Sequence, residues 1–200
     1  MTLPIKRLKL LIAGVGGQGA LTAARFLGEA ALSSGMPVIV GQLHGMSQRG
    51  GSVECSVIFG KGYSSHIGEG EADVVLGLEP LEVKRALPKI SKHTKIVLNL
   101  GKIVPLSLAI AGKSYPPLEG ILEAIREVTP HLFEVDGPDL VKQTGLPRAL
   151  NVALLGALVG LEILPFGREV LWQAIVKKIP LRFLEANRQA FELGISATHA

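Results

Sequence analysis

Hydrophobic positions change their spacing twice within the first forty residues. Lys9–Ala13 is a short apolar run that ends at glycines, as buried strands do. From Ala20 to Ser34 small apolar residues recur at helical spacing on one face, and Gly35 suits the end of a helix. Pro37–Val40 is a second apolar run. The pattern predicts a βαβ unit with parallel strands, in which a glycine turn connects the first strand to the helix.

The next segment alternates between apolar and polar residues. Val53–Phe59 reads as a half-buried strand, and Gly60–Gly62 as a turn into a second short strand at Tyr63, which together form a β-hairpin insertion. Ile103–Ala111 fits neither period. Further strands are predicted at Val74–Leu78, Lys95–Leu98 and Leu132–Val135. Helices are predicted at Leu81–Leu87, Glu119–Thr129, Asp139–Gln143, Pro147–Leu161, Glu169–Lys178 and Leu181–Leu193.

These elements predict one α/β domain over residues 1–200. Its sheet-forming part covers about 1–146, and a helical C-terminal segment covers about 147–195. The expected architecture is Rossmann-like: an open, mostly parallel sheet with flanking helices. The longest apolar stretch, Ala149–Leu164, contains Asn151 and Glu162 and is shorter than the roughly 20 residues of a membrane span. The N-terminus becomes charged too early for a secretory signal, so we expect a cytoplasmic protein without membrane contact.

The composition of the chain excludes some kinds of site and partner. The only cysteine, Cys55, excludes an internal disulfide framework and a cysteine-held iron–sulfur cluster built by this chain alone. Charged residues make up 19% of the 200, and the mean hydropathy is +0.38. Either a large core or surface buried against another chain explains these values. The net charge is +4, but the basic residues are scattered and are not interleaved with aromatic residues. We therefore expect no nucleic-acid partner.

The glycine turn is the first candidate site. Gly14, Gly16 and Gly19 match G-x-G-x-x-G between a strand and a helix, where the helix N-terminus offers free N–H groups to a phosphate. The dinucleotide fingerprint also needs an acid at the end of the second strand, and Gly41 or Gln42 occupies that position. Phosphate binding, partner contact and tight packing of helix on sheet all remain open. The candidate residues are Gly14, Gly16, Gly17, Gln18 and Gly19.

The second candidate is the polar loop after Val40, at the expected carboxyl edge of the sheet. His44 is a candidate acid or base, and Arg49 is a candidate clamp for an anion. A loop that caps backbone groups or packs on a partner is the alternative. Its residues are His44, Gly45, Met46, Ser47, Gln48, Arg49, Gly50 and Gly51.

Other chemistry-bearing residues have structural interpretations. Glu79 and Glu82 are three apart at a helix start, where acids cap and favour the dipole, although a carboxylate pair can also exchange protons. Gly156 and Gly160 suit close helix contact in the core or at an oligomer interface. Cys55 alternates with valines and reads as a small buried hydrophobe. The five histidines lack metal-ligand spacing, and we predict no metal site.

Taken together, the motifs resemble the gamma-type domain of 2-oxoacid:ferredoxin oxidoreductases, especially the indolepyruvate type. The likeness covers nearly the whole chain. It is carried by GVGGQG at 14–19, HGMSQRGGSV at 44–53, GEADVVL at 70–76, EPLE at 79–82 and NRQAFELG at 187–194.

The resemblance implies a subunit of an enzyme that decarboxylates a 2-oxo acid to an acyl-CoA and reduces ferredoxin. It implies that thiamine diphosphate, Mg²⁺, [4Fe–4S] clusters and coenzyme A belong to a large (alpha) partner subunit, in an assembly of two large and two small chains. Ferredoxin would meet the holoenzyme, and this chain would hold no cofactor alone and be inactive alone. A stand-alone Rossmann-like domain that binds a nucleotide or coenzyme A is the alternative, and a scaffold without ligand contact is a third.

Overall fold

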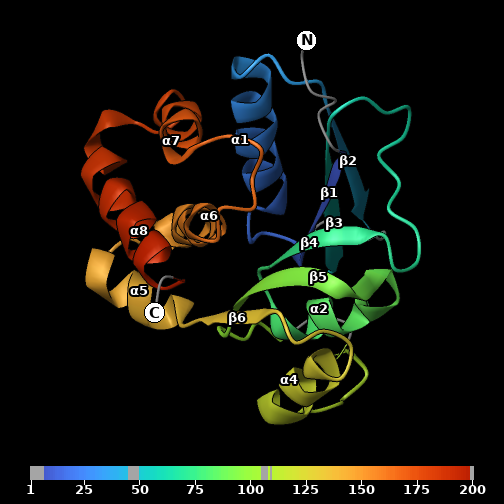
Figure 1. Cartoon of the computed structure of the whole chain (residues 1–200). Coiled ribbons are helices and arrows are strands. Elements are labelled where there is room, and N and C mark those ends of the chain that lie inside the picture. Colours follow the sequence, from blue (N-terminus) through green and yellow to red (C-terminus); the bar gives the residue numbers. More distant parts are fainter. Residues whose placement is uncertain (1–6, 45–49, 105–107, 109, 199–200) are drawn as a thin grey trace.

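The computed structural model describes residues 7–44, 50–104, 108 and 110–198. Six strands form one sheet in the order β2-β3-β1-β4-β5-β6 (Figure 1). β1, β4, β5 and β6 are parallel to one another, while β3 is antiparallel to both β1 and β2. The strands are β1 Leu8–Val15, β2 Val38–His44, β3 Ser52–Phe59, β4 Ala72–Gly77, β5 Ile90–Asn99 and β6 Leu132–Val135. The predicted α/β class and mostly parallel sheet are confirmed.

The two strands of the predicted βαβ unit are not neighbours in the sheet. β1 and β2 run in the same direction, but β3 lies between them. β3 buries Val57, Ile58 and Phe59 completely, which suits an interior strand, whereas β2 leaves Val40 and Gln42 exposed, as an edge strand does. Local periodicity carries no information about which strand inserts between two others.

The antiparallel hairpin also lies elsewhere than predicted. Tyr63 is fully exposed and belongs to no strand, so the expected second strand there is wrong. The hairpin is formed by β2 and β3, and β2 runs four residues beyond Val40 to His44 because Gly41–His44 pairs with Val53–Ser56. The sequence did not predict this pairing, because Gly41 and Gln42 interrupt the apolar pattern after Val40.

Helices cover both faces of the sheet (Figure 1). On one face lie α1, α6, α7 and α8, and on the other lie α2 and α4. The alternation of β1 divides it between the layers: Leu10 and Ile12 pack with the first group, Leu11 and Ala13 with the second. The α-helices are α1 Ala20–Ser33, α2 Pro80–Arg85, α4 Leu118–Arg126, α5 Gly137–Thr144, α6 Leu150–Gly160, α7 Arg168–Val176 and α8 Leu184–Ser196. Short 3-10 helices are η1 Leu87–Lys89, η2 Pro147–Ala149 and η3 Leu181–Phe183.

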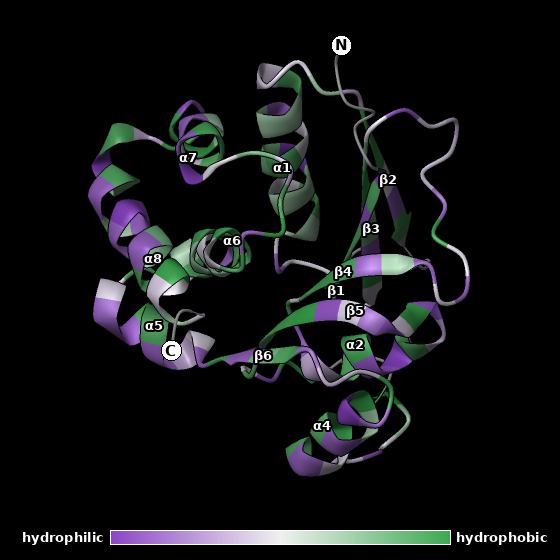
Figure 2. Ribbon diagram, in the orientation of Figure 1, coloured by the Kyte–Doolittle hydropathy of each residue, from purple (hydrophilic) through white to green (hydrophobic). Residues whose placement is uncertain are grey.

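α6 is apolar on nearly all sides, and Figure 2 shows it as hydrophobic where α8 carries hydrophilic residues. None of the helices in the described ranges combines the length and apolar character that crossing a membrane requires. α6 is apolar because α1, α5, α7 and α8 surround it within the domain.

Glycines let α6 and α8 cross at close range. A Cβ at Gly156 would clash with the carbonyl oxygen of Phe191, and a Cβ at Gly194 would clash with that of Ala153. A Cβ at Gly160 would meet Thr198 and the backbone of Ile195. Of the two interpretations of Gly156 and Gly160, contact within the core is therefore confirmed.

Replacing Gly194 with alanine tests this crossing. We expect Gly194→Ala to lower the free energy of unfolding by about 1–3 kcal/mol, because the new methyl group meets backbone rather than a movable side chain. Gly120→Ala is the matched control, since that α4 glycine faces open space and alanine there favours the helix by up to about 1 kcal/mol. Urea unfolding of both variants measures the effect, and equal stabilities would contradict the close crossing.

Candidate functional site

The glycine turn connects the carboxyl end of β1 to the first residue of α1. Gly17 and Gly19 have φ angles of 102° and 82°, which only glycine adopts without strain. A Cβ at Gly14 would lie 3.0 Å from both Gln18 Oε1 and Leu78 Cβ. Gly17 and Gly19 therefore permit a left-handed turn, and Gly14 permits a close approach of β1 to the residue that follows β4.

Gln18 holds this turn together. The N–H of Val15 donates to Gln18 Oε1 at 2.7 Å, and Gln18 Nε2 donates to the carbonyl oxygen of Leu78 at 2.8 Å. The side chain thus bridges β1 and the residue that follows β4. This geometry gives Gln18 a structural role, because both ends of its amide already have protein partners.

The Leu78 carbonyl also accepts a hydrogen bond from the end of β5. Asn99, which is 1% exposed, donates from Nδ2 to Leu78 O at 2.9 Å and accepts from the N–H of Gly101 at 3.0 Å. The N–H of Leu78 donates to Ala13 O at 2.8 Å. Leu78 therefore connects the carboxyl ends of β1, β4 and β5 through its backbone N–H and carbonyl groups.

Asn151, on the first turn of α6, joins the turn to the helical layer. Its Nδ2 donates to the carbonyl oxygen of Gln18 at 2.7 Å, across 133 positions of sequence. A Cβ at Gly19 would clash with Asn151 Nδ2, so glycine at the start of α1 leaves room for this contact. The contact places the start of α6 beside the start of α1.

The structure brings the end of the second candidate loop to the glycine turn. Gly16 donates to Gly51 O at 2.8 Å, and Gly50 donates to Gly16 O at 3.4 Å. His44 is the last residue of β2, opposite Val53, rather than part of a loop. The other predicted members, Gly45, Met46, Ser47, Gln48 and Arg49, lie outside the described residues.

A cavity of about 540 Å³ opens at this junction. The start of α1 faces it without a side-chain cap and without an acidic residue in its first turn. Arg148, which also lines the cavity, supplies a cation. The cavity can therefore offer both backbone N–H groups and a positive charge to an anion. It is lined by Gly16, Gly17, Gln18, Gly19, Thr22, Ile103, Pro147, Arg148, Leu150 and Asn151.

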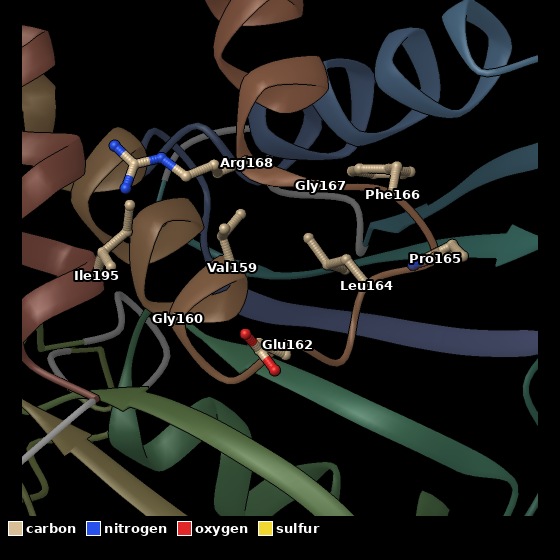
Figure 3. Close-up of a pocket in the computed structure, with 9 residues that line it drawn as sticks. All are labelled: Val159, Gly160, Glu162, Leu164, Pro165, Phe166, Gly167, Arg168 and Ile195. Atoms are coloured by element: carbon tan, nitrogen blue, oxygen red, sulfur yellow. The ribbon is translucent and has the colours of Figure 1, made fainter.

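A second cavity, of about 620 Å³, lies at the other end of α6 (Figure 3). Glu162, Arg168 and Ile195 lie around it together with apolar side chains. The Arg168 guanidinium is already paired with Glu192 at 2.6 Å and with Glu169 at 3.5 Å. We therefore take the glycine-turn cavity as the candidate site, although it is the smaller of the two.

Glu79 and Glu82 lie beside the same sheet edge, at the end of β4. Glu79 caps α2 by accepting the N–H of Glu82 at 3.1 Å, which confirms the capping interpretation. Tyr115 donates a hydrogen bond from its hydroxyl to Glu79 Oε1 at 2.5 Å. Burial raises the pKa of Glu79 despite these bonds. Burial, and the hydrogen bond to the neighbouring Glu79, raise the pKa of Tyr115. Glu82 Oε1 pairs with Arg85 Nη1 at 2.6 Å, while its buried Oε2 has no hydrogen-bond partner.

Asn99, Tyr115, Arg148 and Asn151 contribute to the site and its surroundings but were not among the predicted candidates. One signal was present in the sequence, since Asn151 interrupts an otherwise apolar run. A polar side chain in such a run needs a partner, because burying it unpaired is costly. The identity of the partner, Gln18, depends on the fold alone.

The bonds of Gln18 lead to a stability prediction. We expect Gln18→Ala to lower the free energy of unfolding by about 1–3 kcal/mol, because it leaves the N–H of Val15 without its side-chain partner. Gln42→Ala is the matched control, since that glutamine is exposed on the edge strand, and we expect a change below about 0.5 kcal/mol. Urea unfolding measures both, and a Gln18 variant as stable as the control would refute the structural role.

Comparisons with known proteins agree with this architecture. Indolepyruvate oxidoreductase subunit IorB from Archaeoglobus fulgidus is 38% identical over 188 residues, which is 94% of each chain. The gamma subunit of a keto/oxoacid ferredoxin oxidoreductase from Geobacter sulfurreducens superposes with a TM-score of 0.70 at 21% identity, over 96% of this chain and 98% of that one.

A third similar structure is a 2-oxoglutarate:ferredoxin oxidoreductase from Magnetococcus marinus with 2-oxoglutarate, coenzyme A and succinyl-CoA bound. Its TM-score is 0.76 at 21% identity, over 97% of this chain and 31% of that one.

The family model for pyruvate ferredoxin/flavodoxin oxidoreductase matches residues 9–197, from β1 to the end of α8. That span includes every residue of the glycine-turn cavity. The chain therefore belongs to the pyruvate ferredoxin/flavodoxin oxidoreductase family.

Proposed function

We propose that this chain is the small subunit of a thiamine diphosphate-dependent 2-oxoacid:ferredoxin oxidoreductase of the indolepyruvate type. The enzyme would decarboxylate indolepyruvate or another aryl 2-oxo acid, pass the electron pair of the resulting carbanion to ferredoxin, and transfer the acyl group to coenzyme A. The end-to-end likeness to the archaeal IorB subunit supports this choice of type.

The donor groups of the chain favour a division of labour between subunits. Cys55 is the only cysteine, it is 0% exposed within β3, and burial raises the pKa of its thiol to about 11. Cluster ligands are thiolates and several are needed, so this chain does not fit a [4Fe–4S] cluster. Among the described residues, no group of three or more His, Cys, Asp or Glu side chains is placed to hold a metal ion. We assign the clusters, thiamine diphosphate and Mg²⁺ to a large subunit, in a complex of two large and two small chains.

The resemblance assigned coenzyme A to the large subunit; our proposal differs in that this chain contributes a binding site for the coenzyme A phosphates. The observation that carries this proposal is the glycine-turn cavity, where the uncapped start of α1 and Arg148 face the same space. The coenzyme A in the Magnetococcus enzyme supports the choice of ligand. His44 and Arg49 remain candidates for contact with this site.

The surroundings of the cavity suit a long anionic ligand. A neighbouring hollow of about 330 Å³ shares Thr22, Arg148 and Asn151 with the cavity and adds Lys178 and Arg182. A further hollow along α1 includes Lys178, Arg25 and Glu29. Glu29, the acidic residue there, is paired with Lys178 at 3.2 Å. The groove therefore extends a net positive charge away from the start of α1.

Assembly is the first test of the proposed function. The chain is co-expressed anaerobically with the large subunit, and the purified complex is assayed for iron–sulfur absorption, bound thiamine diphosphate and acyl-CoA formation from indolepyruvate. We expect activity only when both chains are present. Full activity of the large subunit alone would refute the proposal.

Replacing Arg148 tests the coenzyme A site in the assembled enzyme. We expect Arg148→Ala to raise the KM for coenzyme A about 10-fold, since a hydrogen bond to a charged group contributes about 1.5–3 kcal/mol, and to leave kcat at saturating coenzyme A unchanged. Arg126→Ala is the matched control, because that arginine, the last residue of α4, pairs with Glu119 and Glu134 and does not line the cavity. The same KM in both variants would place the coenzyme A phosphates elsewhere.

A further inference from the structure

Glu79 is a buried carboxylate that the proposed function does not use. It is 0% exposed, and it follows Leu78, whose carbonyl anchors Gln18 and Asn99. A carboxylate without water must be satisfied by protein donors, because an unpaired buried charge costs several kcal/mol. The identity of those donors shows what Glu79 holds in place.

Besides the N–H of Glu82 in α2, Glu79 has partners at two residues of one connecting segment, Ile103 and Tyr115. Tyr115 donates its hydroxyl to Glu79 Oε1 at 2.5 Å, and the backbone N–H of Ile103 interacts with the same carboxylate. Ile103 follows β5 closely, and Tyr115 precedes α4. One carboxylate therefore links a residue soon after β5 and a residue soon before α4 to the end of β4.

This attachment bears on the candidate site through Ile103. Ile103 lines the glycine-turn cavity together with Pro147 and Arg148, and the residue is 44% exposed. The Tyr115 ring packs with the core between the sheet and α4, so its hydroxyl is delivered from a fixed position. Glu79 itself does not line the cavity, so its influence on a ligand passes through Ile103.

We propose that Tyr115 and Glu79 form a positioning pair that sets the Ile103 wall of the glycine-turn cavity and thereby its affinity for coenzyme A. The inference rests on the proposed function, because it takes coenzyme A as the ligand of that cavity. Neither residue is catalytic, since neither touches the ligand. Their role is to keep an apolar wall in place while the ligand exchanges.

Removing one hydroxyl tests the pair. In the assembled enzyme, we expect Tyr115→Phe to raise the KM for coenzyme A roughly 3–10-fold, the range for a residue that acts through another, with kcat at saturating coenzyme A unchanged. Phenylalanine keeps the packing of the ring, and circular dichroism melting checks that the variant is folded. Tyr63→Phe is the matched control, because it removes the hydroxyl of the other tyrosine, which is fully exposed.

A double-mutant cycle with Ile103→Ala tests whether Tyr115 affects coenzyme A binding through Ile103. If the pair acts by placing Ile103, Tyr115→Phe has no further effect on the KM in the Ile103→Ala background. Equal effects of Tyr115→Phe in both backgrounds would overturn the proposal. It would also be overturned if the Tyr115→Phe and Tyr63→Phe enzymes had the same KM for coenzyme A. Arg148→Ala separates the two failures: a KM raised by Arg148→Ala but not by Tyr115→Phe rejects the positioning pair alone, whereas no change in either rejects the coenzyme A site.

Discussion

The carbonyl oxygen of Leu78 is the point on which the rest of the candidate site depends. It accepts one hydrogen bond from Gln18 and one from Asn99, at the place where β1, β4 and β5 end. Because Leu78 and Asn99 are each 1% exposed, losing a bond between these groups leaves a buried polar atom unpaired. Gln18 extends the network to α6 through Asn151, and Glu79, the next residue, extends it to the segment before α4. The glycine turn is therefore held in its shape before any ligand binds, which lowers the cost of binding.

The helical layer contributes to the site through packing. Gly156 and Gly194 allow α6 and α8 to cross with backbone in contact, so α6 can lie at the centre of its layer. Its first turn then meets the start of α1, where Asn151 bonds to Gln18 and Arg148 faces the cavity. A core contact between two helices thus determines where a surface cation is placed.

The sequence predicted local features well and pairings poorly. The alanine face of α1, the turn at Gly35 and the glycine motif follow from residue size and φ preference, which act over a few residues. The insertion of β3 between β1 and β2 and the extension of β2 to His44 depend on partners that periodicity does not identify. The Gln18–Asn151 bond spans most of the chain, and only the polar interruption of an apolar helix hinted at it. The family resemblance anticipated the fold class and the membership that the comparisons support.

The central claim is that this chain supplies the glycine-turn cavity to the coenzyme A site of a larger enzyme. A density map of the assembled large and small subunits with coenzyme A bound tests it most directly. The account predicts density for the coenzyme A phosphates at the start of α1, between Gly17 and Arg148. Density for the whole of coenzyme A on large-subunit residues, with the glycine-turn cavity vacant, would contradict it.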